Sequence, residues 1–376
     1  MTAMTRRGTM TSKERLLAVF HRQPTDRLCW TALVDDATRS AMPAAIRELP
    51  MIEFYRHLGC DILCFGNFGL PPETCFVAPC RRVTPDVEVE WQADSDGLQH
   101  QRTKTPWGTL TATFRFGHPV KHPVGTLDEL RILRNLWRST RHEPVGGSTE
   151  SYNRLLGVLG EDGIFAQTLS PSPVQQLLEY DMGLESFYFL EQDDPGAMQE
   201  LLDVMHRRRC EEYAITAERS PVEVVIPVEN TSSNLISPAG YAQYSLPQLR
   251  DFVEIMHSGG KVAILHMCGL LKALLPEIKQ TGLDGVHALT PPPLGDTPWA
   301  EALDLLAEDA VLIGGFAPTV FRNAASSPRE IREAISRWAT PRVRAGHTIL
   351  NAGADGTPLP LEHFYAVRDW MEATAN

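Results

Sequence analysis

The stretch Lys261-Val-Ala-Ile-Leu-His-Met-Cys-Gly269 is a short apolar run that ends on a histidine and a cysteine and then breaks at a glycine. Such a run is typical of a buried β-strand. Side chains two positions apart point to the same face of a strand, so His266 and Cys268 would present an imidazole and a thiol together. Zinc binds both groups, and a catalytic zinc site uses about three protein ligands plus an open position. A buried histidine beside an ordinary core cysteine would give the same pattern. Ligand residues on the neighbouring strands are needed to distinguish a metal site from a pair of core residues.

A second apolar run, Val224-Val-Ile-Pro-Val-Glu-Asn-Thr-Ser232, ends on Glu229 and Asn230. If the two runs are neighbouring parallel strands, their C-terminal ends lie side by side. The carboxylate of Glu229 would then be within reach of an ion held by His266. The two stretches together predict a metal site if the rest of the chain forms a parallel sheet.

Short apolar runs of this kind recur along the chain, separated by helical segments. The eight predicted strands are 28–34, 61–65, 163–168, 223–229, 261–266, 284–289, 311–316 and 347–351. Eight strands that alternate with helices predict a (β/α)8 barrel of about 250 residues or more with insertions. A capping box at Thr11-Ser-Lys-Glu14 predicts a helix before the first strand. The active site of such a barrel lies at the C-terminal ends of the strands, where Glu229 and His266 fall on adjacent strands.

Residues 86–117 have a different hydropathy pattern, in which apolar and polar residues alternate around a turn at Asp96-Gly97. This pattern predicts antiparallel hairpins with one solvated face. We interpret it as a β-hairpin insertion after the second strand of one barrel domain that spans residues 1–376.

The composition narrows the class of protein. The 376 residues include 35 Lys and Arg against 47 Asp and Glu, a net charge of -12, which opposes a broad surface for nucleic acid or anionic membrane. No run reaches the roughly 18 apolar residues of a membrane helix, and the N-terminal residues lack an apolar signal core. The seven cysteines are an odd number, which argues against a disulfide framework. We expect a cytoplasmic protein.

Further motifs extend over nearly the whole chain. They are Ser12-Lys-Glu-Arg-Leu-Leu17 with Pro24-Thr-Asp-Arg27, Leu58-Gly-Cys-Asp-Ile-Leu63, Glu229-Asn-Thr-Ser232, Ser237-Pro238 with Tyr241, His266-Met-Cys-Gly269 and Pro291-Pro-Pro-Leu-Gly-Asp296. With these motifs the chain resembles the uroporphyrinogen decarboxylase superfamily, and within it the methyltransferases that serve corrinoid proteins. The resemblance implies zinc at His266 and Cys268, cobalamin on a separate corrinoid protein as partner, and a homodimer.

Two departures from the superfamily bear on the reaction. The decarboxylase carries arginines for its polycarboxylated substrate after the first strand, whereas Trp30-Thr-Ala-Leu-Val-Asp-Asp36 is acidic here. The methyltransferases carry a second zinc-binding cysteine after the last strand, and the segment Asn351-Ala-Gly-Ala-Asp-Gly-Thr-Pro358 has none. A third zinc ligand would therefore be an oxygen, from Glu229 first or from Asp355 second. Asp355 before Gly356 is equally typical of a turn.

Replacing a thiolate by a carboxylate makes a zinc site harder and better matched to oxygen. We therefore predict that zinc activates the ether oxygen of a methyl ether, such as an aryl methyl ether, for methyl transfer to cob(I)alamin. Beside Glu229, the predicted catalytic residues are Asn230 and Tyr241. Positions near strand ends and in an aromatic wall predict a substrate pocket formed by Asp36, Asn67, Gln167, Trp30 and Phe316.

Three other functions fit the same residues. The chain could transfer methyl groups to a small thiol, although the missing second cysteine weakens that reading. It could be a metal-independent decarboxylase or lyase on the same barrel, or a ligand-binding barrel without catalytic activity.

Overall fold

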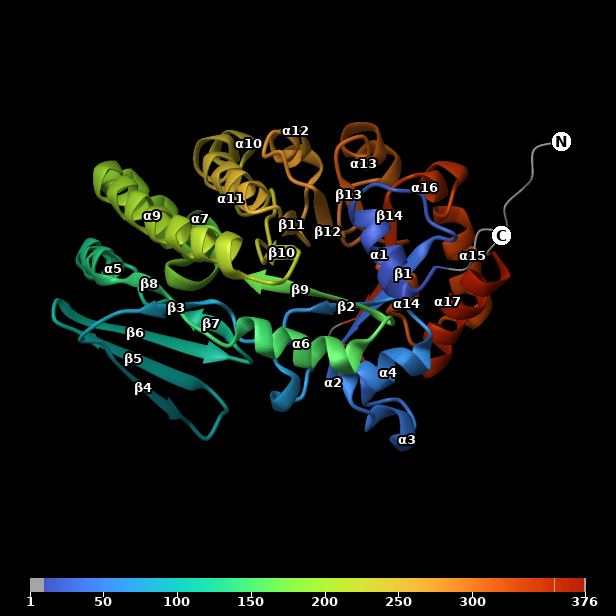
Figure 1. Ribbon diagram of the computed structural model, residues 1–376. Helices are drawn as coiled ribbons and strands as arrows, with labels where there is room; N and C mark the ends of the chain where they lie inside the picture. The colour runs from blue at the N-terminus through green and yellow to red at the C-terminus, as the bar shows by residue number, and fades with distance from the viewer. Residues whose placement is uncertain (1–9, 355, 375–376) are drawn as a thin grey trace.

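A barrel of parallel strands forms the centre of the computed structural model, which describes residues 10–354 and 356–374 (Figure 1). Its eight strands are β1 (Cys29–Val34), β2 (Ile62–Phe65), β9 (Gly163–Leu169), β10 (Val224–Pro227), β11 (Val262–His266), β12 (Gly285–Leu289), β13 (Val311–Gly314) and β14 (Thr348–Ala354). Their order around the barrel is β1-β14-β13-β12-β11-β10-β9-β2. A backbone hydrogen bond of 2.8 Å from Asp61 N to Trp30 O joins β2 to β1. The predicted (β/α)8 barrel is confirmed.

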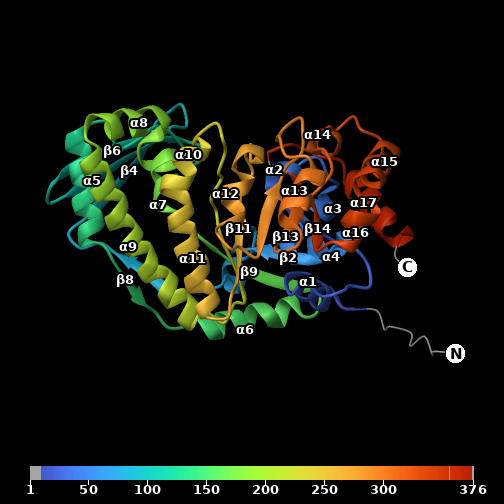
Figure 2. The ribbon, with the colours of Figure 1, turned by 90° about the horizontal axis from the view of Figure 1, so that it is seen from above.

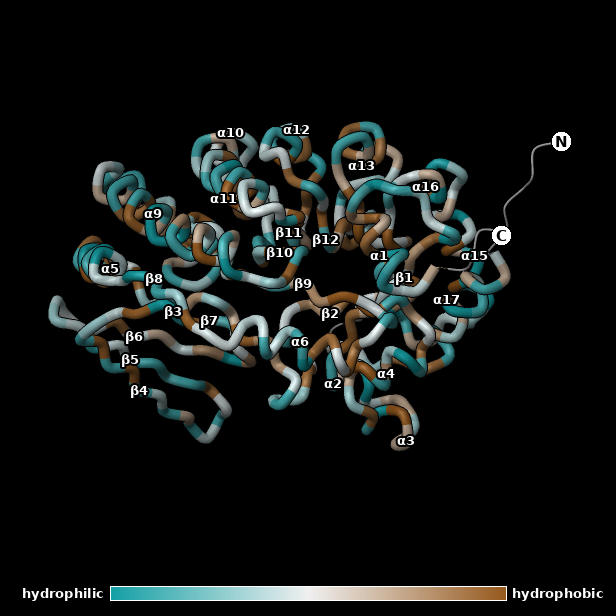
Figure 3. The backbone as a smooth tube through the Cα atoms, in the orientation of Figure 1, coloured by the Kyte–Doolittle hydropathy of each residue, from teal (hydrophilic) through white to brown (hydrophobic). Residues whose placement is uncertain are grey.

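Helices surround the strands and bury their apolar faces against them, as the brown strands and largely teal outer turns show (Figure 3). The described helices of four or more residues around the barrel are α2 (Asp36–Arg39), α3 (Ala44–Arg47), α4 (Met51–Leu58), α6 (Ser148–Leu159), α7 (Pro173–Gln176), α8 (Gly183–Asp193), α9 (Pro195–Arg219), α11 (Leu246–Ser258), α12 (Leu275–Lys279), α13 (Trp299–Leu306), α14 (Pro318–Phe321), α15 (Pro328–Trp338), α16 (Pro341–Ala345) and α17 (Leu361–Ala373). Shorter or π-helical turns are η1 (Pro72–Thr74), η2 (Leu177–Asp181), α10 (Pro238–Gly240), η3 (Tyr241–Ser245) and η4 (Lys272–Leu274). Within the described ranges, no helix combines the length and the apolar composition that a membrane crossing requires.

The N-terminal helix α1 (Ser12–Phe20) closes the end of the barrel where the strands begin (Figure 2). The predicted capping box is present, because the Thr11 side chain accepts from Glu14 N and the Glu14 side chain accepts from Thr11 N. Leu16, Val19 and Phe20 of α1 pack in one apolar cluster with the inward side chains of the strands. The open end of the barrel is therefore the end at which the strands finish.

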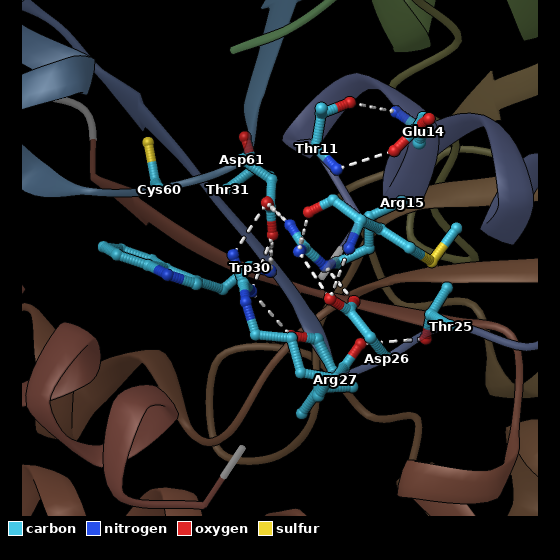
Figure 4. Close-up of polar contacts among 12 residues, drawn as sticks. Thr11, Glu14, Arg15, Thr25, Asp26, Arg27, Trp30, Thr31, Cys60 and Asp61 are labelled. Carbon is cyan, nitrogen blue, oxygen red and sulfur yellow. Dashed lines mark hydrogen bonds and ion pairs between the residues drawn. The ribbon is translucent and has the colours of Figure 1, made fainter. Parts of the chain in front are cut away.

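An ion-pair network beneath the barrel explains why two of the N-terminal motifs occur together (Figure 4). The fully buried carboxylate of Asp61 accepts hydrogen bonds from both Arg15 and Arg27, and from the backbone N–H of Trp30 at 3.2 Å. Arg15 also binds Asp26, at 2.6 Å between Nε and Oδ1. These contacts tie α1 to the start of β1 and β2, so these two motifs serve the fold rather than the reaction.

The chain between β2 and β9 forms two antiparallel sheets beside the barrel (Figure 1). The larger sheet contains β4 (Glu88–Ala93), β5 (Gln99–Thr105), β6 (Gly108–Arg115) and β7 (His118–Lys121), and the smaller one pairs β3 (Cys80–Val83) with β8 (Arg141–Pro144). Leu110 and Ala112 on β6 are buried, and β6 packs on α5 (Leu127–Ser139). The alternating sequence therefore reflects one face packed on a helix and one face in solvent.

A buried carboxylate lies where this insertion meets the barrel. Asp181, at the end of the π-helical turn η2, lines a cavity of about 300 Å³ together with Arg82 and Trp137. Its Oδ2 atom is buried and makes no hydrogen bond within the described residues, and its Oδ1 atom accepts from Gln176 at 3.4 Å. Burial raises the pKa of Asp181 to about 6, although the Gln176 hydrogen bond and the Arg82 charge act against that rise.

We expect the Asp181→Asn variant to be more stable than the wild type at pH 7. A carboxyl whose pKa is raised on folding costs stability when it is ionised, by about 1.4 kcal/mol per pKa unit. The penalty is full above the folded pKa of about 6 and disappears below the unfolded value of 3.8. The gain should therefore be up to about 3 kcal/mol at pH 7 and vanish near pH 4, as measured by urea unfolding across this range. An equal gain at both pH values would contradict this account.

Candidate active site

His266 lies inside the barrel at the end of β11, in contact with a second histidine. Its Nδ1 atom is 2.7 Å from Nδ1 of His287 on β12. The Phe65 ring stacks on His287, with ring centroids 5.0 Å apart, and lies 5.3 Å from the His266 ring. His287 is 2% exposed, and this burial, assisted by the charge of His266, holds its pKa well below 6.5. One of the two facing nitrogens must donate and the other accept, so each ring fixes the tautomer of the other.

Cys268 lies beyond the end of β11 and is exposed. Its Sγ atom is 3.5 Å from Oδ1 of Asn230, and the Asn230 Nδ2 donates to Glu179 Oε1 at 2.9 Å. Gln175 Nε2 donates a hydrogen bond to the other carboxylate oxygen, Glu179 Oε2, at 3.3 Å. The thiol is thus connected to a carboxylate through one side-chain amide. Glu179 and Gln175 were missed in the sequence, because the π-helical turn that brings Glu179 to Asn230 leaves no simple spacing to read.

Glu229 faces away from the interior of the barrel. Val228 forms a parallel bridge with His266, so the next side chain along the strand points to the opposite face. Ser172 donates to both Glu229 oxygens, through its backbone N and through Oγ at 2.8 Å. Glu229 is fully buried, and desolvation raises its pKa to about 7 while the Ser172 bonds and the Arg209 charge act to lower it.

Tyr241 shares the buried space behind β10 with Glu229. Its side chain is fully buried, and its hydroxyl makes no hydrogen bond within the described residues. Burial, with the nearby charge of Glu229, raises its pKa well above 10. The structure therefore places two of the predicted catalytic residues together, but on the helix side of the strand rather than beside His266.

Among the described residues, the predicted metal ligands are not assembled as a set of three. Among the described residues, no group of three or more ligand atoms within 4.8 Å of one another includes His266, Cys268 or Glu229. Asp355 lies outside the described residues. The described part of the chain thus provides an imidazole and a thiol at the end of one strand, with the Glu229 carboxylate bound to Ser172.

Two predicted pocket residues lie behind the barrel wall. Trp30 is 1% exposed and packs in the outer core between the strands and the helices. Gln167 is 2% exposed and accepts from Ser220 Oγ at 2.6 Å. Both strands are apolar on their two faces, so the sequence gives no sign of which side chains point inward.

The other predicted pocket residues lie nearer the open end. Asp36 is exposed in α2, and Asn67 is exposed and bridges to both backbone groups of Phe76. Phe316 lines a cavity of about 90 Å³ at the ends of β12, β13 and β14, together with Asn351. The Asn351 Oδ1 atom is buried there and has no hydrogen-bond partner within the described residues.

Left-handed backbone at two non-glycine residues marks the same end of the barrel. Asn230 has φ +44°, and Ala288 has φ +69° at an irregularity of β12 between His287 and Leu289. Such conformations cost about 1–3 kcal/mol and are concentrated at functional sites. Asn230 follows β10, the strand next to His266, and Ala288 directly follows His287 on β12.

Comparison with known proteins agrees with the barrel fold. Residues 177–373 match the family model described as uroporphyrinogen decarboxylase (URO-D), which is more than half of the chain. The chain belongs to the uroporphyrinogen decarboxylase family. The match begins at η2 and includes Glu179, Asn230, His266, Cys268 and His287.

Solved structures share the fold of this family member. A methyltransferase from Methanosarcina mazei superposes with a TM-score of 0.59 at 14% sequence identity, covering 97% of this chain and 99% of that one. At this identity the likeness concerns the fold. No curated protein matches the chain.

Proposed function

We propose that this member of the uroporphyrinogen decarboxylase family is a zinc-dependent methyltransferase. It would take a methyl group from a methyl ether, such as an aryl methyl ether, and pass it to the cob(I)alamin of a separate corrinoid protein. Family membership and the name of the structural neighbour support methyl transfer as the class of reaction. Zinc and the ether substrate are inferred from the residues of the site, and the corrinoid partner from the resemblance of the chain to methyltransferases that serve corrinoid proteins.

The contact between His266 and His287 carries this proposal. A histidine that binds a metal through one nitrogen almost always donates its other N–H to a fixed acceptor. Nδ1 of His266 faces His287 at 2.7 Å, and the depressed pKa of His287 keeps that ring neutral and able to accept. The arrangement leaves Nε2 as the His266 atom suited to a metal.

The described residues fit zinc in part. His266 and Cys268 provide the nitrogen and sulfur ligands that zinc prefers. A third ligand would come from Asp355 or from Glu229, and Glu229 would have to leave Ser172 and turn from the helix side of its strand to the interior of the barrel. Zinc held in this way would supply Lewis acidity to the ether oxygen of the donor.

The side chains around the ligands then have separate tasks. His287 holds the His266 ring, and the amide of Asn230 holds the position of Cys268 through its bond to Glu179. Phe65 and Phe316 offer apolar surface to the body of an aromatic donor. In the proposed reaction the methyl–oxygen bond would break, the oxygen would keep the electron pair and take a proton from water, and the methyl group would pass to the cob(I)alamin of the partner.

The test combines metal analysis with an activity assay. The purified protein, prepared without chelator and offered zinc, should contain zinc at the barrel mouth and should methylate free cob(I)alamin from at least one of a panel of aryl and alkyl methyl ethers. Zinc without methyl transfer from any ether, but with transfer to a small thiol, would favour the thiol methyltransferase. Absence of mouth zinc would overturn the proposal and leave a metal-independent decarboxylase or a ligand-binding barrel.

We expect His287 to act as a positioning residue. The His287→Leu variant removes the acceptor for His266 Nδ1 and should weaken zinc affinity by about 10–100-fold. The His287→Asn variant places an amide oxygen near the lost Nδ1 atom and should recover much of that affinity. Both values come from competition with a chromophoric chelator. Equal affinities for the two variants would contradict the role, since general damage to packing would not distinguish them.

A further inference from the structure

A second group of metal-ligand side chains lies outside the barrel, between α9 and α11. These two helices run side by side on the outer layer (Figures 1 and 2). His206 and Cys210 are four residues apart on α9 and therefore project from one face, one turn apart. Asp251 faces them from α11. One ligand atom from each residue lies within 4.8 Å of the other two, and among the described residues this is the only such group.

From this geometry we propose that His206, Cys210 and Asp251 form a second zinc site, which fastens α9 to α11. The site is independent of the function proposed for the barrel mouth. Zinc takes nitrogen at about 2.0 Å, sulfur at about 2.3 Å and carboxylate oxygen at about 2.1 Å, so tetrahedral ligand atoms lie about 3.3–3.6 Å apart. The distance from His206 Nε2 to Cys210 Sγ is 3.6 Å, which fits that geometry. The distance from His206 Nε2 to Asp251 Oδ2 is 2.7 Å and would have to lengthen by less than about 1 Å.

The charges around the group favour a cation. The carboxylates of Asp251 and Glu211 both lie close enough to the Cys210 thiol to act on it electrostatically. Two guanidiniums of α9 near the group form ion pairs on the same helix, Arg208 with Glu211 and Arg209 with Glu212. A divalent ion would balance the thiolate and the carboxylate together. The Asp251 side chain is 50% exposed, so water can complete the coordination.

One feature of His206 limits the affinity. Its Nδ1 atom is buried and has no hydrogen-bond partner within the described residues. In the metal-free protein the proton can stay on Nε2 and point to Asp251, whereas a metal on Nε2 moves the proton to Nδ1. Because that N–H then lacks an acceptor, we expect weaker binding here than at the barrel mouth.

The experiment separates the two sites by variants. The His266→Ala/Cys268→Ser double variant removes the mouth ligands and should still bind one Co²⁺ per chain with a thiolate-to-cobalt absorption band. Adding Cys210→Ser should abolish that band. Adding Cys75→Ser, which replaces a half-buried cysteine that belongs to neither ligand group, should not. The Asp251→Asn variant is a second test. It changes the side chain little in size at an exposed position and should weaken cobalt binding at least about tenfold. Zinc should also raise the unfolding temperature of the double variant. It should leave the unfolding temperature of the triple variant that contains Cys210→Ser unchanged.

Two results would overturn the second site. One is a double variant that retains its circular dichroism spectrum but shows no thiolate band with Co²⁺. The other is a band that persists when Cys210 is replaced. Either result leaves the mouth proposal intact, because zinc at the mouth is measured separately in a Cys210→Ser chain with His266 and Cys268 unchanged.

Discussion

The His266→Ala and Cys268→Ser variants are expected to lose zinc at the barrel mouth and at least about 1,000-fold in the rate of methyl transfer. A Lewis-acid metal supplies several kcal/mol of stabilisation to a leaving oxygen, and about 4 kcal/mol corresponds to three powers of ten. Both side chains lie at the end of β11, where their replacement leaves the barrel core intact. The folded state of each variant should therefore be retained.

The measurements are zinc content by mass spectrometry and initial rates with cob(I)alamin and the best ether. Cys75→Ser serves as the matched control, because it also replaces a cysteine that is not fully buried. Glu229→Gln in the same series tests the third ligand, and retention of zinc in this variant would leave Asp355 as the candidate. Full activity in Cys268→Ser would contradict a catalytic metal at this position.

The Asp61→Asn variant is expected to lose about 3–5 kcal/mol in the free energy of unfolding. Removing one partner of a buried ion pair leaves an uncompensated buried charge, and that loss is the main cost. Asp61 has no exposed surface and accepts hydrogen bonds from both Arg15 and Arg27, so the asparagine would leave Arg27 without this anion and Arg15 with Asp26 alone. The amide has nearly the volume of the carboxylate, so packing changes little.

Urea unfolding at pH 7 measures this loss. The control is Asp128→Asn, whose carboxylate pairs with Arg131 but is 87% exposed, and which should change stability by no more than about 1 kcal/mol. A loss of similar size in both variants would show that burial of the network contributes little. Activity per folded molecule should stay unchanged in Asp61→Asn, because the network lies at the opposite end of the barrel from His266.

The sequence alone determined which segments are barrel strands and their order along the chain. Parallel strands that are buried on both faces read as continuous apolar runs, and helical segments separate all eight runs. The N-terminal helix was also predictable, since the capping box at Thr11 and Glu14 is a local signal. These features depend on neighbours in the chain, and a sequence displays them directly.

Because these strands are buried on both faces, the sequence does not show which of their side chains point into the barrel. On β1, β9 and β10 both faces are apolar, so the alternation that would separate the inward face from the outward face is missing. Gln167 and Glu229 were expected at the mouth from their positions near strand ends, and Trp30 was expected there as part of an aromatic wall. The structure places all three on the helix side.

The contact between His266 and His287 depends on the lateral pairing of β11 with β12. The register pairs these residues directly across the two strands, although 21 positions separate them in the chain. The link from Cys268 through Asn230 to Glu179 likewise needs the π-helical turn η2 to pack against the loop after β10. Sequence thus determined that a histidine and a cysteine stand at the end of a barrel strand. The tertiary structure decided their partners, because those contacts come from strand register and loop packing rather than from local spacing.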